Sequence, residues 1–286
     1  MNCEPVRLQR QESETGVWEM ASRLPAPELR PYAFTYEGYR EWSTVTVVRR
    51  EVPLPGVVLV IGFEGQFRMT DPRIGPEGID FSCFVAGPHD SFVFTESIGV
   101  NGGLQVNLTP IGAYQFFGLP MSEIANRSVD LADLFGADGR RLAERLREAR
   151  DWETRFNLLD AAILHRLASA PTPASGVTHA WRRMRDAHGL IDIGALAEEV
   201  GWSRKHLAAQ FSTQVGLAPK VMARVLRFNR AISLVNAPES SSDWSSIAFD
   251  CGYYDQSHLI REFREFAGLT PGEFARALSH QGNIES

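Results

Sequence analysis

The chain has 286 residues, of which 44% are hydrophobic and 22% are charged, and its formal net charge is −6. Because this length exceeds the usual size of one domain, we expect two. No apolar run approaches the roughly 18 to 20 residues of a membrane-spanning helix, and the start lacks the basic and apolar regions of a signal peptide. Cys3, Cys83 and Cys251 are too scattered for a disulfide framework or a zinc ribbon. We therefore expect a reduced, cytoplasmic protein without a membrane partner, a metal or a cofactor.

The first predicted domain, residues 1–168, is β-rich. Short β-branched and aromatic runs alternate with Pro, Gly and Asp clusters, a pattern typical of an antiparallel barrel or sandwich. From Pro110 onward the pattern is helical, and two amphipathic stretches in residues 131–168 are split near Asp151. The predicted strands are residues 44–48, 57–61, 66–69, 81–85, 92–95 and 103–108.

A linker is predicted at residues 169–176, because Pro171 and Pro173 remove backbone donors and favour extended neighbours. Residues 177–280 are predicted to form an all-helical second domain, so the fold class is α+β. Charge changes along the same boundary. Residues 1–175 hold 17 Lys and Arg against 23 Asp and Glu, whereas residues 176–286 hold 12 of each. Residues 200–238 contain no acidic residue, but they contain Arg204, Lys205, Lys220, Arg224, Arg227 and Arg230.

The second domain contains one pattern twice. His206-Leu207 is followed at offsets of 5, 5 and 3 by Phe211, Gly216 and Pro219, and His258-Leu259 is followed at the same offsets by Phe263, Gly268 and Pro271. Ala197 precedes Gly201 by four residues, as Ala248 precedes Gly252. Self-similarity of this kind indicates a supersecondary unit that is built twice.

Each copy is predicted to be a helix-turn-helix. A short helix over residues 193–200 ends at Gly201, which tolerates left-handed geometry, and Ser203 caps the next helix. Leu207 and Phe211 then face the first helix. In the second copy Gly252 provides the turn and Asp255 the cap. Such a hairpin is the arrangement that brings one helix into a DNA major groove.

A long helix is predicted between the two copies, from Pro219 to Val235. Its apolar residues recur at steps of 4, 3, 4 and 3, as expected for a helix packed between two subdomains. A helix of about 17 residues is roughly 25 Å long. It could therefore hold two recognition helices near the 34 Å spacing of successive major grooves.

The motifs Gly201-Trp-Ser-Arg-Lys-His-Leu…Phe211…Gly216…Pro219 and Gly252-Tyr-Tyr-Asp-Gln-Ser-His-Leu…Phe263…Gly268-Leu-Thr-Pro271 resemble the AraC/XylS family of bacterial transcription factors. The resemblance covers residues 177–278. It implies a sequence-specific transcriptional regulator without catalytic activity, located in the cytoplasm with the nucleoid and bound to double-stranded promoter DNA. Residues 108–120 are similar to sensory domains attached to some members, which implies only a regulatory role. Candidate partners besides DNA are a small-molecule effector, RNA polymerase and a second copy of the chain.

The resemblance also assigns DNA contacts. On the first recognition helix these are Arg204, Lys205 and Gln210; Ala208 and Ala209 stand where many members carry a polar or arginine residue, so we expect weaker base recognition there. The second unit offers Gln256 for adenine, Arg261 for guanine, and Ser257. His206 and His258 are expected to support the fold. Lys220 and Arg227, on the connecting helix, complete the predicted contacts.

An enzyme, or a DNA repair protein, fused to a DNA-binding tail is the alternative. The first domain has only His89 and His165, far apart in sequence, where a metal-dependent barrel enzyme needs a His and carboxylate cluster. Cys83 lies in an apolar strand, unlike an activated thiolate. The ligand-binding residues are left open. The aromatic residues of the strands are expected mainly in the core, and they are Phe63, Phe67, Phe81, Phe84, Phe92 and Phe94.

Overall fold

The computed structural model describes residues 4–236 and 244–282 of the chain. Within these residues, nine strands form one antiparallel sheet in the order β1-β2-β3-β8-β4-β7-β9, and β5 pairs with both β6 and β8. Apart from the short 3-10 helix at residues 27–29, every helix of the described residues follows the long strand that ends at Leu108. The strands are β1 (Arg7–Ser13), β2 (Gly16–Arg23), β3 (Ala33–Glu51), β4 (Val57–Glu64), β5 (Phe67–Thr70), β6 (Ile79–Phe81), β7 (Cys83–Ala86), β8 (Val93–Leu108) and β9 (Ser128–Asp130).

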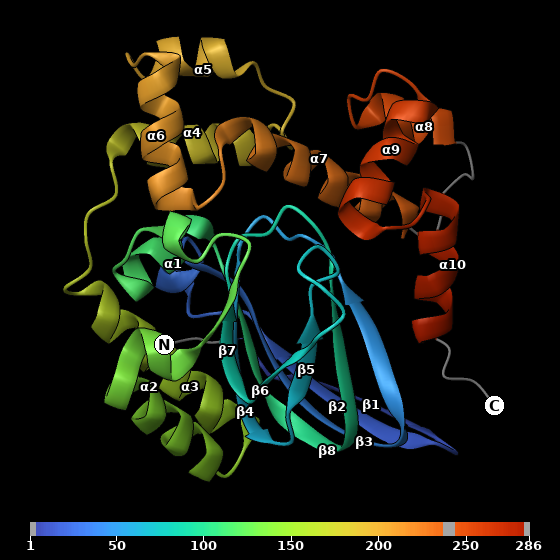
Figure 1. Cartoon of the computed structure of the whole chain (residues 1–286). Helices are drawn as coiled ribbons and strands as arrows, with labels where there is room; N and C mark the ends of the chain where they lie inside the picture. Colours follow the sequence, from blue (N-terminus) through green and yellow to red (C-terminus); the bar gives the residue numbers. More distant parts are fainter. Residues whose placement is uncertain (1–3, 237–243, 283–286) are drawn as a thin grey trace.

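The long strands β3 and β8 pair with each other over most of their length and form the spine of the sheet. Their register shifts between Ser43 and Val47, which is a bulge that bends both strands. Beyond the bend β8 pairs with β5 on one side, whereas its other half pairs with β4. The sheet consequently curls around an interior (Figure 1), in agreement with the predicted barrel or sandwich.

The two faces of the sheet have different partners. Leu59 and Ile61 of β4 point to a core that also contains Phe116 and Phe156 of the helices, whereas Val60 points to a second cluster with Phe84. Successive side chains of a strand point to opposite faces, so one face packs on helices and the other lines the interior. The helices of this part are η1 (Pro27–Leu29), α1 (Pro110–Phe117), η2 (Met121–Glu123), α2 (Leu131–Glu148) and α3 (Trp152–Leu167).

Each predicted strand overlaps an observed one, but the bounds differ: residues 92–95 and 103–108 belong to the single strand β8, and residues 81–85 overlap both β6 and β7. Strands β1, β2 and β9 were not predicted. Residues 44–48 and 103–108 are parts of β3 and β8. The edge strand β1 is mostly exposed and has the sequence RLQRQES, so it lacks an apolar alternation that would predict a strand. It exists because it pairs with β2 in a regular ladder. Tertiary pairing here overrides local preference.

The C-terminal part is entirely helical among the residues that the structure describes. Its core joins both repeats through the connecting helix α7, with Leu207, Phe211, Phe228, Leu259 and Phe263 all buried. Helix α4 begins at Ser175, so the last two residues of the predicted linker are helical. The helices are α4 (Ser175–Asp186), α5 (Ile193–Glu199), α6 (Arg204–Val215), α7 (Pro219–Val235), α8 (Trp244–Asp250), α9 (Gln256–Ala267) and α10 (Pro271–Gly282).

Candidate nucleic-acid interface

Both turns have the predicted local geometry. Gly201 and Gly252 adopt φ angles of 70° and 69°, in the left-handed region that favours glycine. Ser203 then accepts a hydrogen bond from the backbone N–H of His206 at 3.2 Å, and Asp255 accepts one from that of His258 at 2.7 Å. These caps fix where the recognition helices α6 and α9 begin, and they confirm the two predicted helix-turn-helix units.

The recognition helices are attached to the rest of the protein by their C-terminal ends. A Cβ atom at Gly216, which ends α6, would lie 2.7 Å from Cγ of Pro88, and one at Gly268, which ends α9, would lie 2.6 Å from Cζ of Phe92. Figure 1 shows the two helix-turn-helix units at opposite ends of α7, above the β-rich part. The N-terminal turns of α6 and α9, which carry the predicted contacts, therefore lie at the far ends from these attachments.

On α6 the predicted contact residues differ in their surroundings. Arg204 and Lys205 are exposed and form no ion pair with any residue that the structure describes. Gln210 is half-buried, and its Oε1 accepts a hydrogen bond from Gln214 Nε2 at 3.1 Å. His206 is exposed, and its ring packs edge-on to that of Trp202 with the ring centres 4.6 Å apart. The first turn of α6 thus presents two basic side chains without ion-pair partners among the described residues, whereas the Gln210 amide is already bonded to Gln214.

On α9, Gln256, Ser257 and Arg261 are all exposed. Arg261 has no carboxylate partner among the described residues. His258 is half-buried, with its ring edge-on to Tyr253 at 5.3 Å. The second unit therefore presents a guanidinium, an amide and a hydroxyl together, which are groups that can bond to base edges or phosphates.

A groove of about 890 Å³ lies between the two units and is lined by basic residues of both repeats and of α7. Lys220 is exposed on this groove. Arg224, in contrast, is paired twice: its Nε donates a hydrogen bond to Glu262 Oε1 at 2.7 Å, and its Nη2 forms an ion pair with Glu265. These two carboxylates raise the pKa of Arg224. The basic residues of the lining are Arg204, Lys220, Arg224, Arg227 and Arg261.

Arg227 also has an internal partner. Its Nη2 lies 3.9 Å from Glu262 Oε1, its guanidinium lies 5.8 Å from the centre of the Tyr253 ring, and 21% of its side chain is exposed. Glu262 itself is 3% exposed, so it needs the positive charges around it. DNA contact by Arg227 stays a prediction, and such contact would compete with this internal role.

The β-rich part contains a cavity of about 350 Å³ that the sequence did not predict. Phe67 and Phe84 were expected in the core, and both line this cavity, although Phe84 is also buried. A cavity between two halves of a curled sheet depends on the bend at the β3–β8 bulge, and the short alternating runs do not reveal that bend.

The loop between β7 and β8 connects the cavity with both recognition helices. Gly87, His89, Ser91 and Val93 line the cavity. Of the three residues between them, Pro88 lies against Gly216 and Phe92 against Gly268, whereas Asp90 pairs with Arg73. One short segment therefore lines the cavity with alternate residues and contacts the ends of α6 and α9 through Pro88 and Phe92.

A second segment, at the end of β3, makes a similar connection. Val52 and Pro53 line the cavity, and the carbonyl of Pro53 accepts a hydrogen bond from Asn229 Nδ2 of α7 at 2.9 Å. The preceding Arg50 donates to the carbonyl of Ala267 in α9 at 2.7 Å. Its guanidinium lies 4.6 Å from the ring centres of both Phe92 and Phe94. The two segments thus meet at the end of α9.

The thiols of the described residues are unreactive, and these residues contain neither a metal-binding cluster nor a membrane-spanning helix. Burial raises the pKa of Cys83, and burial raises that of Cys251 to about 11, so neither is a reactive thiolate near neutral pH. Cys3 lies outside the described residues. Residues 4–236 and 244–282 contain no group of three or more His, Cys, Asp or Glu side chains placed to hold a metal ion. None of the helices in these ranges is long and apolar enough to cross a membrane.

Comparisons with known proteins agree with this geometry. Residues 196–277 match the family model described as "Helix-turn-helix domain", and residues 21–130 match a domain of unknown function. An uncharacterized HTH-type transcriptional regulator of Bacillus subtilis (strain 168), YbfI, is 28% identical over 124 residues, covering 41% of this chain and 44% of that protein. The match thus spans less than half the length of this relative.

Two solved structures are also similar to this chain in part or for most of its length. ToxT from Vibrio cholerae O395 is similar with a TM-score of 0.47 and 12% identity, over 85% of this chain and 97% of ToxT. The DNA-binding domain of AdpA, a global transcriptional factor solved in complex with a target DNA, is similar with a TM-score of 0.35 and 20% identity, over 39% of this chain and all of that domain.

Proposed function

We propose that this chain, whose C-terminal domain belongs to the AraC/XylS family of double helix-turn-helix domains, is a sequence-specific DNA-binding transcriptional regulator. The observation that supports this proposal most directly is the pair of exposed N-terminal turns on α6 and α9. Each turn carries basic or amide side chains without a carboxylate partner among the described residues, and a common core holds both turns. Helix-turn-helix proteins contact base edges with these N-terminal turns.

Selection of bound fragments from the host genome by the full-length protein tests the function and yields the operator. We expect an enriched sequence with two half-sites about 10 base pairs apart, as two recognition helices on one duplex face require. Scrambling either half-site should weaken binding at least about 100-fold, since specific sites are commonly bound 10³ or more times tighter than random DNA. Enrichment of no sequence, or equal binding to scrambled DNA, would contradict the proposal.

We further propose that a small molecule in the cavity of the β-rich domain controls DNA binding. The support is the loop of residues 87–93, whose alternate residues line the cavity and contact Gly216 and Gly268. A ligand that displaces Ser91 or Val93 would also move Pro88 and Phe92, because they are neighbours in one short backbone segment. The orientation of α6 relative to α9 would then change, and with it the fit to two successive major grooves.

Truncation of the contact tests this control independently of the ligand's identity. Phe92→Ala removes the ring that packs on Gly268, so we expect its operator affinity, measured by fluorescence anisotropy without any added ligand, to change by at least threefold. Phe34→Ala, a partly exposed phenylalanine of the same domain that does not line the cavity, is the matched control and should leave affinity unchanged. Equal affinities for the wild type and both variants would argue against coupling through this loop.

The other predicted properties of the chain keep the status of predictions. RNA polymerase and a second copy of the chain are predicted partners, and the cytoplasm with the nucleoid is the predicted location. The division into residues 1–168, 169–176 and 177–280 is likewise a proposal. For the alternative of an enzyme or repair protein, no specific observation on the described residues offers support, because the thiols have raised pKa values.

A further inference from the structure

The cavity of the β-rich domain has one wall of adjoining aromatic rings. The centres of the Tyr39 and Phe67 rings lie 5.8 Å apart, and those of Phe67 and Phe84 lie 6.4 Å apart. Trp18 of β2 also lines the cavity. Its volume of about 350 Å³ is near the lower end of the roughly 300–1,000 Å³ typical of ligand pockets. The cavity is thus suited to a small ligand with a compact apolar body.

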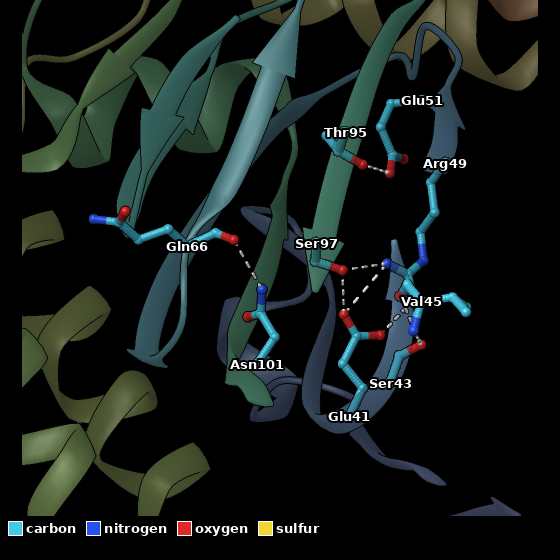
Figure 2. A network of polar contacts seen from close by, with 9 residues as sticks. All are labelled: Glu41, Ser43, Val45, Arg49, Glu51, Gln66, Thr95, Ser97 and Asn101. Atoms are coloured by element: carbon cyan, nitrogen blue, oxygen red, sulfur yellow. Dashed lines mark hydrogen bonds and ion pairs between the residues drawn. The ribbon is translucent and has the colours of Figure 1, made fainter. Parts of the chain in front are cut away.

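The charged residues of the lining are mainly acidic. Three carboxylates, Glu37, Glu41 and Glu51, line the cavity together with one guanidinium, that of Arg49. Arg49 is already paired, because its Nη1 lies 3.3 Å from Glu41 Oε1 and its Nη2 bonds to the other oxygen of that carboxylate. Figure 2 shows the Arg49 side chain extending toward Glu41 and Ser97 and away from Glu51. The only guanidinium of the described lining therefore neutralises Glu41, and Glu37 and Glu51 remain without a positively charged partner.

Glu37 and Glu51 have only neutral donors as partners among the described residues. Glu51 accepts a hydrogen bond from Thr95 Oγ1 at 2.9 Å (Figure 2), and Glu37 accepts one from Thr35 Oγ1 at 3.2 Å. Burial raises the pKa of Glu37, so its charged form lacks favourable surroundings. Burial lowers the pKa of His89, which consequently adds no positive charge near neutral pH. The lining thus carries two carboxylates without a positively charged partner among the described residues, of which Glu37 is half-buried and Glu51 is exposed to solvent at the edge of the cavity.

We propose that this cavity binds a small organic cation, an amine or ammonium group on a compact apolar body. The cationic group lies beside Glu37 or Glu51, and the apolar body packs on the aromatic wall, whose ring faces also attract cations. A carboxylate ligand is disfavoured, because it would meet two unbalanced carboxylates and a guanidinium that Glu41 already occupies. The binding of such a cation does not depend on the proposed effector role. Only its expected effect on DNA binding rests on that role.

Calorimetric titration of the full-length protein with matched ligand triplets tests the proposal. Each triplet consists of an amine, an alcohol and a carboxylate on the same body, and the bodies are hexyl, cyclohexylmethyl and phenethyl. We expect the amine to have a Kd at least tenfold lower than the alcohol and the carboxylate in one or more triplets. Equal or tighter binding of the carboxylate, equal binding of the alcohol, or no binding of any amine up to 10 mM, a concentration of the order of the weakest useful affinities, would overturn it.

Two conservative variants locate the cation. Glu37→Gln and Glu51→Gln keep the hydrogen bonds from the threonines but remove the charge, and at least one of them should weaken amine binding fivefold or more without weakening alcohol binding. Glu64→Gln, at the exposed end of β4 and outside the lining, is the control and should have no effect. Unchanged amine binding in both variants would also overturn the proposal. Amine binding that leaves operator affinity unchanged would instead contradict only the effector role.

Discussion

The contact between Gly268 and the β-rich domain can be isolated with a pair of glycine substitutions. Gly268 and Gly201 have φ angles of 67° and 70°, so an alanine costs a similar strain at both positions, about 1 to 2 kcal/mol. Their surroundings differ. A Cβ atom at Gly201 has no heavy atom within 4 Å, whereas at Gly268 it would lie 2.6 Å from Phe92 Cζ and 2.7 Å from Arg50 Nη1. Only Gly268→Ala should therefore disturb the contact between the domains.

The magnitude follows from the hydrogen bond that Arg50 donates to the Ala267 carbonyl at 2.7 Å. Hydrogen bonds of charged groups contribute roughly 1.5 to 3 kcal/mol, and the lower value applies because Arg50 is only partly buried. Gly201→Ala should thus lower the free energy of unfolding by about 1.5 kcal/mol and Gly268→Ala by about 3 kcal/mol, from strain plus the lost bond.

A double-mutant cycle removes the contribution of backbone strain. Arg50→Met is combined with each glycine variant, and urea unfolding is followed by circular dichroism at 222 nm. We expect Arg50→Met to cost about 1.5 kcal/mol in the wild type and beside Gly201→Ala, but close to nothing beside Gly268→Ala, since the bond is already lost. A coupling energy within about 0.5 kcal/mol of zero for the Arg50 and Gly268 pair would refute this reasoning.

Four further predictions concern DNA binding and pH. Arg261→Ala should cost about 1 to 3 kcal/mol against the operator and much less against random DNA, whereas Lys220→Ala should weaken both by similar factors; equal losses for Arg261→Ala would show backbone contact only. The logarithm of operator affinity should fall with that of salt with a slope of roughly −3 to −4, because four predicted contact residues, Arg204, Lys205, Lys220 and Arg261, have no ion-pair partner among the described residues and each contributes about −0.9; a slope near zero would contradict their contact with phosphates. Residues 176–286 alone should fold and bind the operator, and helical fragments without any operator binding would disprove this independence. Because burial lowers the pKa of His89, the unfolded chain binds a proton that the folded chain does not, so stability should fall as pH falls below about 6.5. His89→Gln should therefore reduce the decrease in melting temperature between pH 7.5 and pH 5, and an equal decrease in the variant and the wild type would exclude this cause.

The C-terminal helices were largely predictable because local chemistry determines them. Gly201, Ser203, Gly252 and Asp255 each set a helix end through a backbone angle or a cap within three residues. Connecting helix α7 has the predicted bounds, because Pro219 starts it and its apolar positions recur with helical spacing. Features of this kind depend on neighbours in the sequence, so a single chain contains the information.

The internal partners of the basic residues were not predictable in the same way. Arg224 and Arg227 belong to a stripe without acidic neighbours in sequence, yet Glu262 reaches both from α9, 38 and 35 residues later. The cavity was not predictable for the same reason, because Glu37, Glu41 and Arg49 come together with Phe84 only after β3 bends and the sheet curls. Contacts across such distances follow from tertiary packing, which spacing along the chain does not encode.

The length of α7 has a consequence for the DNA itself. Its 17 residues extend over about 25 Å, whereas successive major grooves on one face of a straight duplex are about 34 Å apart. If both units enter grooves while their C-terminal ends stay on the β-rich domain, the duplex must curve toward the protein. Smooth bending of such a site costs of order 1 to 6 kcal/mol, depending on its stiffness. We therefore expect flexible pyrimidine–purine steps between the half-sites to favour binding, even without side-chain contacts to those base pairs.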